Sequence, residues 1–243
     1  MEEISILHEK ARLRMSANAG RRCNMITAWE IKQNPQIRTY IEKADEALAA
    51  LGFTEHSYAH VTRAAHFAQK LLSDLGFPER TCELAWIAGY MHDIGNVINR
   101  IDHAQSGAIM AFRILDRLGM PADEIATICS AIGNHDEHTA FPVNPVAAAL
   151  ILSDKTDVRR TRVRNRDLSS FDIHDRVNYA VERASTRLTE DHSSIVLNLE
   201  IDTGMSPVID YFEIFLERML LCRKAAEKLG LRFTLVINGQ QVL

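Results

Sequence analysis

A histidine–aspartate pair, His92-Asp93, ends the apolar stretch AWIAGYM, where ionisable side chains are costly to bury unless a cation lies against them. Four more side chains that could bind a metal ion occur at intervals which helices could bring together: His60, His103, His135 and Asp154. Imidazole and carboxylate groups in this mixture suit a first-row transition metal or Mg²⁺. Together these side chains could bind two ions. The residues therefore indicate a metal-dependent enzyme.

Five short motifs carry a resemblance to a known superfamily. They are HVTRAAHFAQKLL from residue 60, MHDIG at 91–95, HAQSGA at 103–108, IATICSAIGNHDEH at 125–138 and LSDKTD at 152–157. In this order and with these gaps they resemble the motifs of the HD-domain metal-dependent phosphohydrolases, over residues 37–166. The resemblance implies that the activity is hydrolysis of a nucleotide or of another small phosphate ester or anhydride. It also implies two divalent metal ions (Fe, Mn, Mg, Co or Zn) as cofactors, with these ligands: His60, His92, Asp93, His103, His135 and Asp154.

The ligand set is similar to that of the two-metal branch, which includes symmetric dinucleoside-tetraphosphate hydrolases and HD-GYP cyclic-dinucleotide phosphodiesterases. The sequence GYP is missing after the His135 motif, which disfavours the second group. The string DKTDVRR at 154–160 is closer to the tetraphosphatase pattern, in which an arginine six residues after the aspartate faces the substrate. Arg160 holds that position. Asn96 stands where both groups commonly have a lysine, so the role of that lysine does not carry over.

The way in which the ligands would share two ions follows from helix geometry. Neighbouring residues of a helix point about 100° apart, so a helix end can direct His92 and Asp93 at two different ions. The Asp93 carboxylate can then bridge them, because both of its oxygens carry lone pairs. Two divalent ions roughly 3.5–4 Å apart can hold a bridging hydroxide and bind phosphoryl oxygens. We expect His60, His92, Asp93 and Asp154 around the first ion, and Asp93, His103 and His135 around the second.

Basic and polar side chains beside the motifs are candidates for substrate binding, because guanidinium groups match phosphate oxygens. The expected substrate-binding residues are Arg63, Asn96, Lys155, Asp157 and Arg160, and the expected catalytic residues are Asp93, Lys155 and Arg160. The arginine-rich run 159–166 has an alternative explanation, a solvated helix end whose cations offset the helix dipole. Two other histidines leave the ligand set open. His56 competes with His60 for its role, and His138 could be an extra ligand.

The overall composition is that of an ordinary globular protein, with 47% apolar and 25% charged residues. A net charge of −4 gives no electrostatic case for binding nucleic acid or an anionic membrane. The cysteines lack CxxC spacing, the N-terminus lacks an apolar signal core, and no apolar stretch reaches the roughly 20 residues that span a bilayer. We therefore expect a cytoplasmic protein without membrane association, whose partner is a small phosphorylated substrate.

Helices must position the ligands. Apolar residues at helical spacing, with glycine or proline at the ends, predict helices over 36–51, 57–75, 79–94, 105–118, 123–132 and 144–164. They form the expected HD-domain helical bundle over 36–170, which follows a helical segment over 1–35. Alternating apolar and polar residues predict strands over 194–201 and 231–238, on either side of a helix over 206–229. Residues 177–188 fit a strand or a helix, and a strand is slightly favoured. The fold class is thus mainly α, with a small C-terminal α+β appendage over 171–243.

Two other functions are compatible with the same residues. The ligand set also resembles that of HD-fold mixed-valent di-iron oxygenases, although basic residues beside it favour a phosphate over a neutral polyol. The second alternative is a metal-bearing regulatory or scaffold protein whose appendage mediates association. The stretch YFEIFLERMLLC at 211–222 has apolar residues on most faces, so it would pack against the strands or against another subunit in a homodimer.

Overall fold

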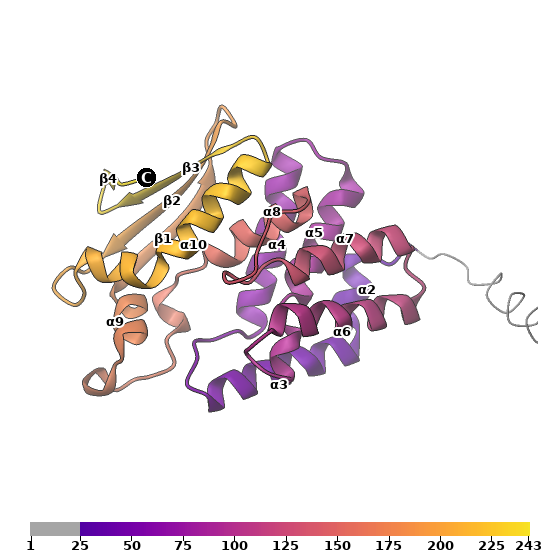
Figure 1. The fold of residues 1–243 in the computed structure, drawn as a ribbon, viewed down its shortest axis with the longest axis horizontal. Helices are drawn as coiled ribbons and strands as arrows, with labels where there is room; N and C mark the ends of the chain where they lie inside the picture. Colours follow the sequence, from indigo (N-terminus) through magenta and orange to yellow (C-terminus); the bar gives the residue numbers. More distant parts are fainter. Residues whose placement is uncertain (1–24) are drawn as a thin grey trace, which may run out of the picture.

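The computed structural model describes residues 25–243, so most of the helical segment expected over 1–35 lies outside the described residues. The described chain forms a helical bundle followed by a smaller α+β part (Figure 1). The bundle consists of α2 (Ala28–Gln33), α3 (Pro35–Ala50), α4 (Tyr58–Asp74), α5 (Glu79–Met91), the 3-10 turn η1 (Ile94–Val97), α6 (His103–Leu118), α7 (Ala122–Gly133) and α8 (Pro145–Lys155). The mainly α fold expected from the sequence is confirmed.

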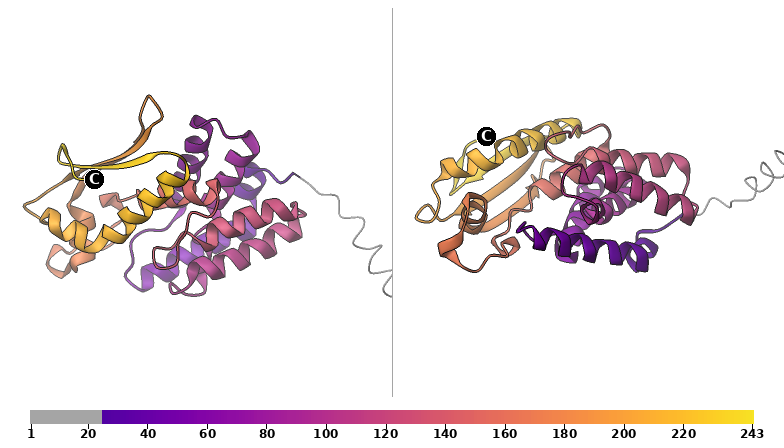
Figure 2. Two further views of the ribbon diagram at one scale, coloured as in Figure 1. Left: turned by 45° about the horizontal axis from the view of Figure 1, so that its top comes forward. Right: turned by 60° about the horizontal axis from the view of Figure 1, so that its bottom comes forward.

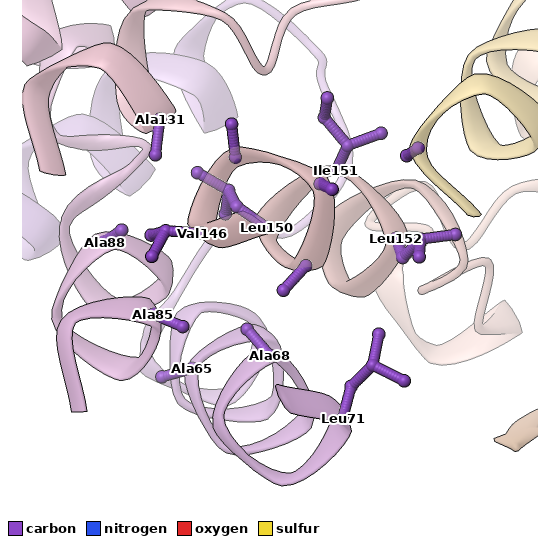
Figure 3. Close-up of a cluster of buried hydrophobic side chains, with 14 of the residues drawn as sticks. Ala65, Ala68, Leu71, Ala85, Ala88, Ala131, Val146, Leu150, Ile151 and Leu152 are labelled. Atoms are coloured by element: carbon purple, nitrogen blue, oxygen red, sulfur yellow. The ribbon is translucent and has the colours of Figure 1, made fainter. Parts of the chain in front are cut away.

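Helix α8 is the central element of the bundle. The Asn144 side chain caps its first turn, and Pro145 begins it at a position where a missing N–H costs nothing. Every residue of 146–155 is buried, as expected for a helix with apolar side chains on nearly all faces. Figure 3 shows its side chains among small residues of α4, α5 and α7: Ala65, Ala68, Ala85, Ala88 and Ala131. These small residues let the neighbouring helices approach closely, and the end of α8 that carries Asp154 is therefore buried.

Two glycines bring stretches of backbone into contact. A β-carbon on Gly89 would lie 2.7 Å from Cα of Ala65, so α5 approaches α4 more closely than a larger residue would allow. After α5 the chain turns through η1, where a β-carbon on Gly95 would overlap the backbone at the start of α6. Helix α5 ends at Met91, earlier than the sequence suggested, and the histidine–aspartate pair lies between α5 and η1.

The rest of the chain forms a four-stranded sheet with helices packed against it. Its elements are α9 (Ile173–Ala180), β1 (Val181–Leu188), β2 (Ser194–Ile201), α10 (Val208–Lys228), β3 (Arg232–Ile237) and β4 (Gln240–Gln241). The order is β1-β2-β3-β4; β1 and β2 are antiparallel, whereas β2 and β3 are parallel because α10 crosses over between them. Buried residues alternate along β2, at Ile195, Leu197 and Leu199, so the sheet has one apolar face. Figure 2 shows α10 lying along the sheet.

The appendage shares its core with the bundle. The buried apolar residues form one cluster that includes Leu150 of α8 and Met219 of α10, and α10 packs on α8 as well as on β3. Both expected strands are present, and residues 177–188 are divided between the end of α9 and β1. Among the described helices, none combines the length and the apolar character needed to cross a membrane.

One expected helix is wrong in its length. The helix predicted over 144–164 ends at Lys155, and the arginine run after it forms a loop that contains the 3-10 turn η2 (Arg160–Arg162). The guanidinium group of Arg162 is buried and donates a hydrogen bond of 2.8 Å to the backbone carbonyl of Asp157. This contact holds the loop after α8 in a turn. A further 3-10 turn, η3 (Leu168–Ser170), leads into α9.

Candidate metal centre

Six buried side chains from different elements converge inside the bundle, and we call them the ligand cluster. They are His60 on α4, His92 and Asp93 in the turn after α5, His103 at the start of α6, His135 after α7 and Asp154 near the end of α8. None of these residues is more than 7% exposed. The structure therefore brings together the whole ligand set that the resemblance implied.

One half of the ligand cluster surrounds a single point. His60 Nε2 lies 3.2 Å from Asp154 Oδ1 and 3.6 Å from Asp93 Oδ2. His92 Nε2 lies 3.0 Å from the same oxygen of Asp93 and 3.8 Å from Asp154 Oδ1. Imidazole nitrogens and carboxylate oxygens thus face one another as they would around one metal ion.

The other oxygen of Asp93 faces two further histidines. Asp93 Oδ1 lies 3.7 Å from His103 Nε2 and 4.0 Å from His135 Nε2. The two histidine nitrogens are 3.1 Å apart. One carboxylate therefore has an oxygen in each half of the ligand cluster, which is the arrangement of a ligand that bridges two cations.

Hydrogen bonds at Nδ1 fix the orientation of the four imidazole rings. Nδ1 of His92, His103 and His135 lies 2.8, 3.0 and 2.6 Å, respectively, from the backbone carbonyl oxygen three residues earlier. Nδ1 of His60 lies 2.8 Å from Asp157 Oδ2. Because carbonyl and carboxylate oxygens only accept, each Nδ1 carries a proton, and each Nε2 faces into the ligand cluster, where it can bind a metal ion.

Several of these inward-facing atoms have no partner. Among the described residues, the buried side-chain atoms without a hydrogen bond are His60 Nε2, His92 Nε2 and Asp93 Oδ2. Leaving such an atom unsatisfied costs about 1–3 kcal/mol, and here the three lie side by side. In the other half, the lone pairs of His103 and His135 face each other. A cation in each half would satisfy all of these atoms, so the residues fit divalent metal ions.

Burial and neighbouring charges shift the pKa values of the two carboxylates in opposite directions. Burial alone would raise the pKa of Asp93, but the neighbouring histidines, His92 first, hold it well below its usual value. Burial would also raise the pKa of Asp154, and Lys155 is the main group that lowers it instead. Burial holds the pKa of His135 well below that of a free histidine. Ionised carboxylates and a neutral imidazole are the forms that bind metal.

Comparison with known proteins agrees with this geometry. The family model of the HD domain matches residues 57–176, a range that contains every member of the ligand cluster. This protein contains an HD domain. The chain is also similar to the uncharacterized protein MJ1020 of Methanocaldococcus jannaschii, with 24% identity over an alignment 181 residues long, which covers 65% of this chain and 70% of the relative. The HD match therefore bears on function, whereas the relative carries no assigned activity.

Two of the residues expected to bind substrate hold the aspartates of the HD domain. Asn96 Nδ2 donates a hydrogen bond of 2.9 Å to Asp93 Oδ1 and a second one to the Asp93 backbone carbonyl. Lys155 Nζ lies 2.7 Å from Asp154 Oδ2. Asn96 is 2% exposed and Lys155 is 3% exposed. The structure therefore places both side chains where they orient a carboxylate.

Two others lie behind His60. Asp157 is buried and accepts hydrogen bonds from His60 Nδ1 and from the guanidinium group of Arg159. Arg63 Nε lies 3.9 Å from Asp157 Oδ1, and its side chain is 59% exposed. Asp157 thus acts on a ligand, whereas Arg63 extends from the same region into solvent.

Arg160 is not brought to the ligand cluster. Its guanidinium lies over the Tyr179 ring, 4.5 Å from the ring centre, and its Nε donates to the Tyr179 carbonyl. Glu182 lies 3.8 Å away. The expectation rested on the motif position of Arg160, six residues after Asp154, and the loop after Lys155 directs Arg160 towards the appendage. The alternative of a solvated helix end is also wrong, because α8 ends at Lys155, before the arginine run, and Arg162 is buried.

Three charged residues at the HD site were not identified from the sequence. Arg100, which follows η1, has Nη1 3.3 Å from His103 Nε2. Glu137 lies in the loop after α7, between Lys155 and Arg218 of α10. Arg100 and Glu137 lie within three positions of a ligand histidine, which was a usable signal. Nothing in the sequence near Arg218 indicates that it belongs there.

The two alternative histidines lie outside the ligand cluster. The ring of His56 is 5.4 Å from that of His60, and its Nδ1 lies 2.7 Å from the Thr54 carbonyl. Burial holds the pKa of His56 well below its usual value. His138 is exposed. His56 therefore borders the candidate centre, and His138 faces solvent.

Proposed function

We propose that this protein is a metal-dependent phosphohydrolase that cleaves a nucleotide or another small phosphate ester or anhydride. The observation that carries the proposal is the Asp93 carboxylate, whose two oxygens face two separate groups of histidine nitrogens. The unpartnered atoms beside it support the binding of cations. The HD domain supports the class of reaction.

The proposed centre holds two divalent ions, one in each half of the ligand cluster. Ions bound there would polarise phosphoryl oxygens and lower the pKa of water, so that water becomes a nucleophile near neutral pH. The chain itself directs each Nε2 towards the ions and holds each carboxylate in place. The groups that do this are Asp157, Asn96, Lys155 and the backbone carbonyls at Gly89, Arg100 and Ile132.

We assign phosphate binding to Arg100 rather than to Arg160. The Arg100 guanidinium is half-buried beside His103 and lies over the Phe53 ring, 5.7 Å from its centre. Its hydrogen bonds to the described residues use Nη1, which leaves Nε and Nη2 as donors for a ligand. A guanidinium with free donors at the edge of a metal centre matches two oxygens of a phosphate. Arg63 provides a second cation on the α4 side.

Metal analysis combined with a phosphatase panel tests this function. The purified protein should carry about two metal ions per chain and hydrolyse at least one dinucleoside polyphosphate, nucleoside monophosphate or cyclic dinucleotide. Asp93→Asn should lose both metal and activity, because it removes the carboxylate that faces both halves. His138→Asn is the matched control, since His138 lies three residues from a ligand but is exposed. It should keep both properties.

Two results would contradict the proposed reaction. Metal-loaded protein that is inert against the whole panel would remove the phosphohydrolase proposal and leave the metal centre. Iron in the centre, together with oxygen consumption on a carbon substrate, would favour the di-iron oxygenase instead.

A further inference from the structure

Helix α10 of the appendage reaches the HD site through one side chain. It lies against α8 (Figure 1), and Arg218 on α10 donates a hydrogen bond of 2.7 Å from Nε to Glu137 Oε1. Glu137 belongs to the loop after α7, two positions after His135. The Arg218 guanidinium is also held over the Phe215 ring, 4.5 Å from its centre. The contact therefore joins the appendage to the segment that carries a ligand.

The chain of contacts continues to a member of the ligand cluster. The second oxygen of Glu137, Oε2, lies 3.2 Å from Lys155 Nζ. The same Nζ lies 2.7 Å from Asp154 Oδ2. Positive and negative groups thus alternate from Arg218 to Asp154. Their side chains are largely shielded from solvent, with exposed fractions of 23% at Arg218, 14% at Glu137, 4% at Lys155 and 10% at Asp154.

The side-chain positions along this series of charged contacts depend on one another. Each oxygen of Glu137 has its own cation, Arg218 at Oε1 and Lys155 at Oε2. Without Arg218, the charge of the partly buried Glu137 would be balanced by Lys155 alone, and leaving a charge shielded from solvent and undercompensated is unfavourable. Lys155 Nζ would then move towards Glu137 and away from Asp154 Oδ2. The other oxygen of Asp154, Oδ1, is the one that faces His60 and His92.

We propose that Arg218 is a positioning residue of the metal centre, which acts through Glu137 and Lys155 to hold the Asp154 carboxylate. The appendage therefore completes the HD site rather than serving as a separate module. This inference rests on the metal centre of the proposed function, but it does not depend on the substrate or on the reaction.

Binding of Mn²⁺ to the full-length chain, measured by equilibrium dialysis, tests the inference. Arg218→Gln should weaken Mn²⁺ binding about tenfold, the usual lower size of an effect transmitted through a ligand's partner. Loss of a positive charge by itself would strengthen the binding of a cation, so weaker binding identifies positioning. Adding Glu137→Gln to Arg218→Gln should recover most of the loss, because the unbalanced charge that draws Lys155 away is then removed.

Arg176→Gln is the matched control. It removes an ion pair of 3.2 Å between Arg176 of α9 and Asp210 of α10. Asp210 is on the same helix as Arg218, but this ion pair does not involve Glu137 or Lys155. It should leave Mn²⁺ affinity unchanged. Thermal unfolding of each metal-free variant reports separately on packing. If Arg218→Gln does not fold, Arg218→Lys replaces it and should show a smaller loss of affinity, since it keeps the charge.

The outcomes distinguish the two proposals. Wild-type protein that binds Mn²⁺, with a folded Arg218 variant of equal affinity, overturns this inference alone. A double variant that binds as weakly as Arg218→Gln also overturns it, because the effect would then come from lost packing. Wild-type protein that binds no divalent ion overturns both this inference and the proposed function.

Discussion

The backbone carbonyl oxygen of His103 lies 2.0 Å from the position that a β-carbon on Gly95 would take. The backbone amide of Gly107 lies 2.5 Å from the same position. The turn after Asp93 can therefore touch the first turn of α6 only because residue 95 has no side chain. This contact sets the distance between Asp93 Oδ1 and the His103 imidazole, and it links the two halves of the ligand cluster.

Gly95→Ala should destabilise the protein and disturb the ligand cluster, because the atoms in its way are backbone. We expect a loss of about 3 kcal/mol in the free energy of unfolding, measured by denaturant titration, together with weaker Mn²⁺ binding. Gly133→Ala is the control, since its β-carbon would meet only the Ala108 side chain at 3.6 Å. It should change stability by no more than about 1 kcal/mol, in the stabilising direction. A Gly95→Ala protein as stable as wild type would show that the close approach is wrong.

Asp157→Asn should weaken metal binding although it replaces no member of the ligand cluster. Both oxygens of Asp157 accept hydrogen bonds, from His60 Nδ1 and from Arg159, so an amide group must oppose one of these donors. The His60 ring then loses its fixed orientation, and Mn²⁺ affinity should fall about tenfold. Asp74→Asn removes an exposed ion pair with Lys70 at the end of α4, the helix that carries His60. It should leave the Mn²⁺ affinity unchanged. Equal affinities for the two variants would argue against a role for Asp157.

Arg100 and Arg160 can be compared directly. Arg100→Gln should raise the KM for the best phosphate substrate about 10- to 100-fold, the range expected for hydrogen bonds to a charged group. Arg160→Gln should leave KM near the wild-type value, because Arg160 is held by Tyr179 and Glu182. Inorganic phosphate should likewise inhibit the Arg100 variant more weakly than the Arg160 variant. The reverse order would restore the role that the sequence suggested for Arg160.

The stability of the protein should fall at alkaline pH, in part because of Cys222. This free thiol of α10 is fully buried, and burial raises its pKa to about 12. A pKa that is higher in the folded state contributes stability below the unfolded value of about 8.5, and that contribution is lost as pH rises towards the folded value. Urea titrations from pH 8 to 11 should therefore show a smaller loss in Cys222→Ala than in wild type. Parallel curves would exclude this contribution.

The side chains of the ligand cluster and most of the helices could be identified from the sequence, because their signals are local. His60 stands on a helix whose alanines recur on its buried face, and His92-Asp93 ends an apolar run at a glycine turn. Likewise, the alternation in 194–201 corresponds to β2 residue for residue. Period and spacing describe contacts between near neighbours in the chain, and these elements depend mainly on such contacts.

The features that the sequence did not predict depend on contacts between residues far apart in the chain. In the loop that follows α8, Arg162 donates a hydrogen bond to the carbonyl of Glu55, 107 positions before it. Arg218 meets Glu137 across 81 positions, and no motif connects them. The motif pattern, an arginine six residues after Asp154, predicted that Arg160 lies at the site, whereas the folded chain turns Arg160 towards Tyr179. Only the packed structure shows which cations reach the ligand cluster.

In the proposed metal centre, the unpartnered atoms at His60, His92 and Asp93 would tie the stability of the protein to the supply of the bound ion. An ion that binds the native chain but not the unfolded one shifts the folding equilibrium in proportion to its free concentration. Chains that remain unfolded are degraded by cellular proteases. When the ion is scarce, the cell would therefore contain fewer copies of this protein. A shortage of the metal would lower the amount of the protein before it lowers the catalytic rate of each remaining copy.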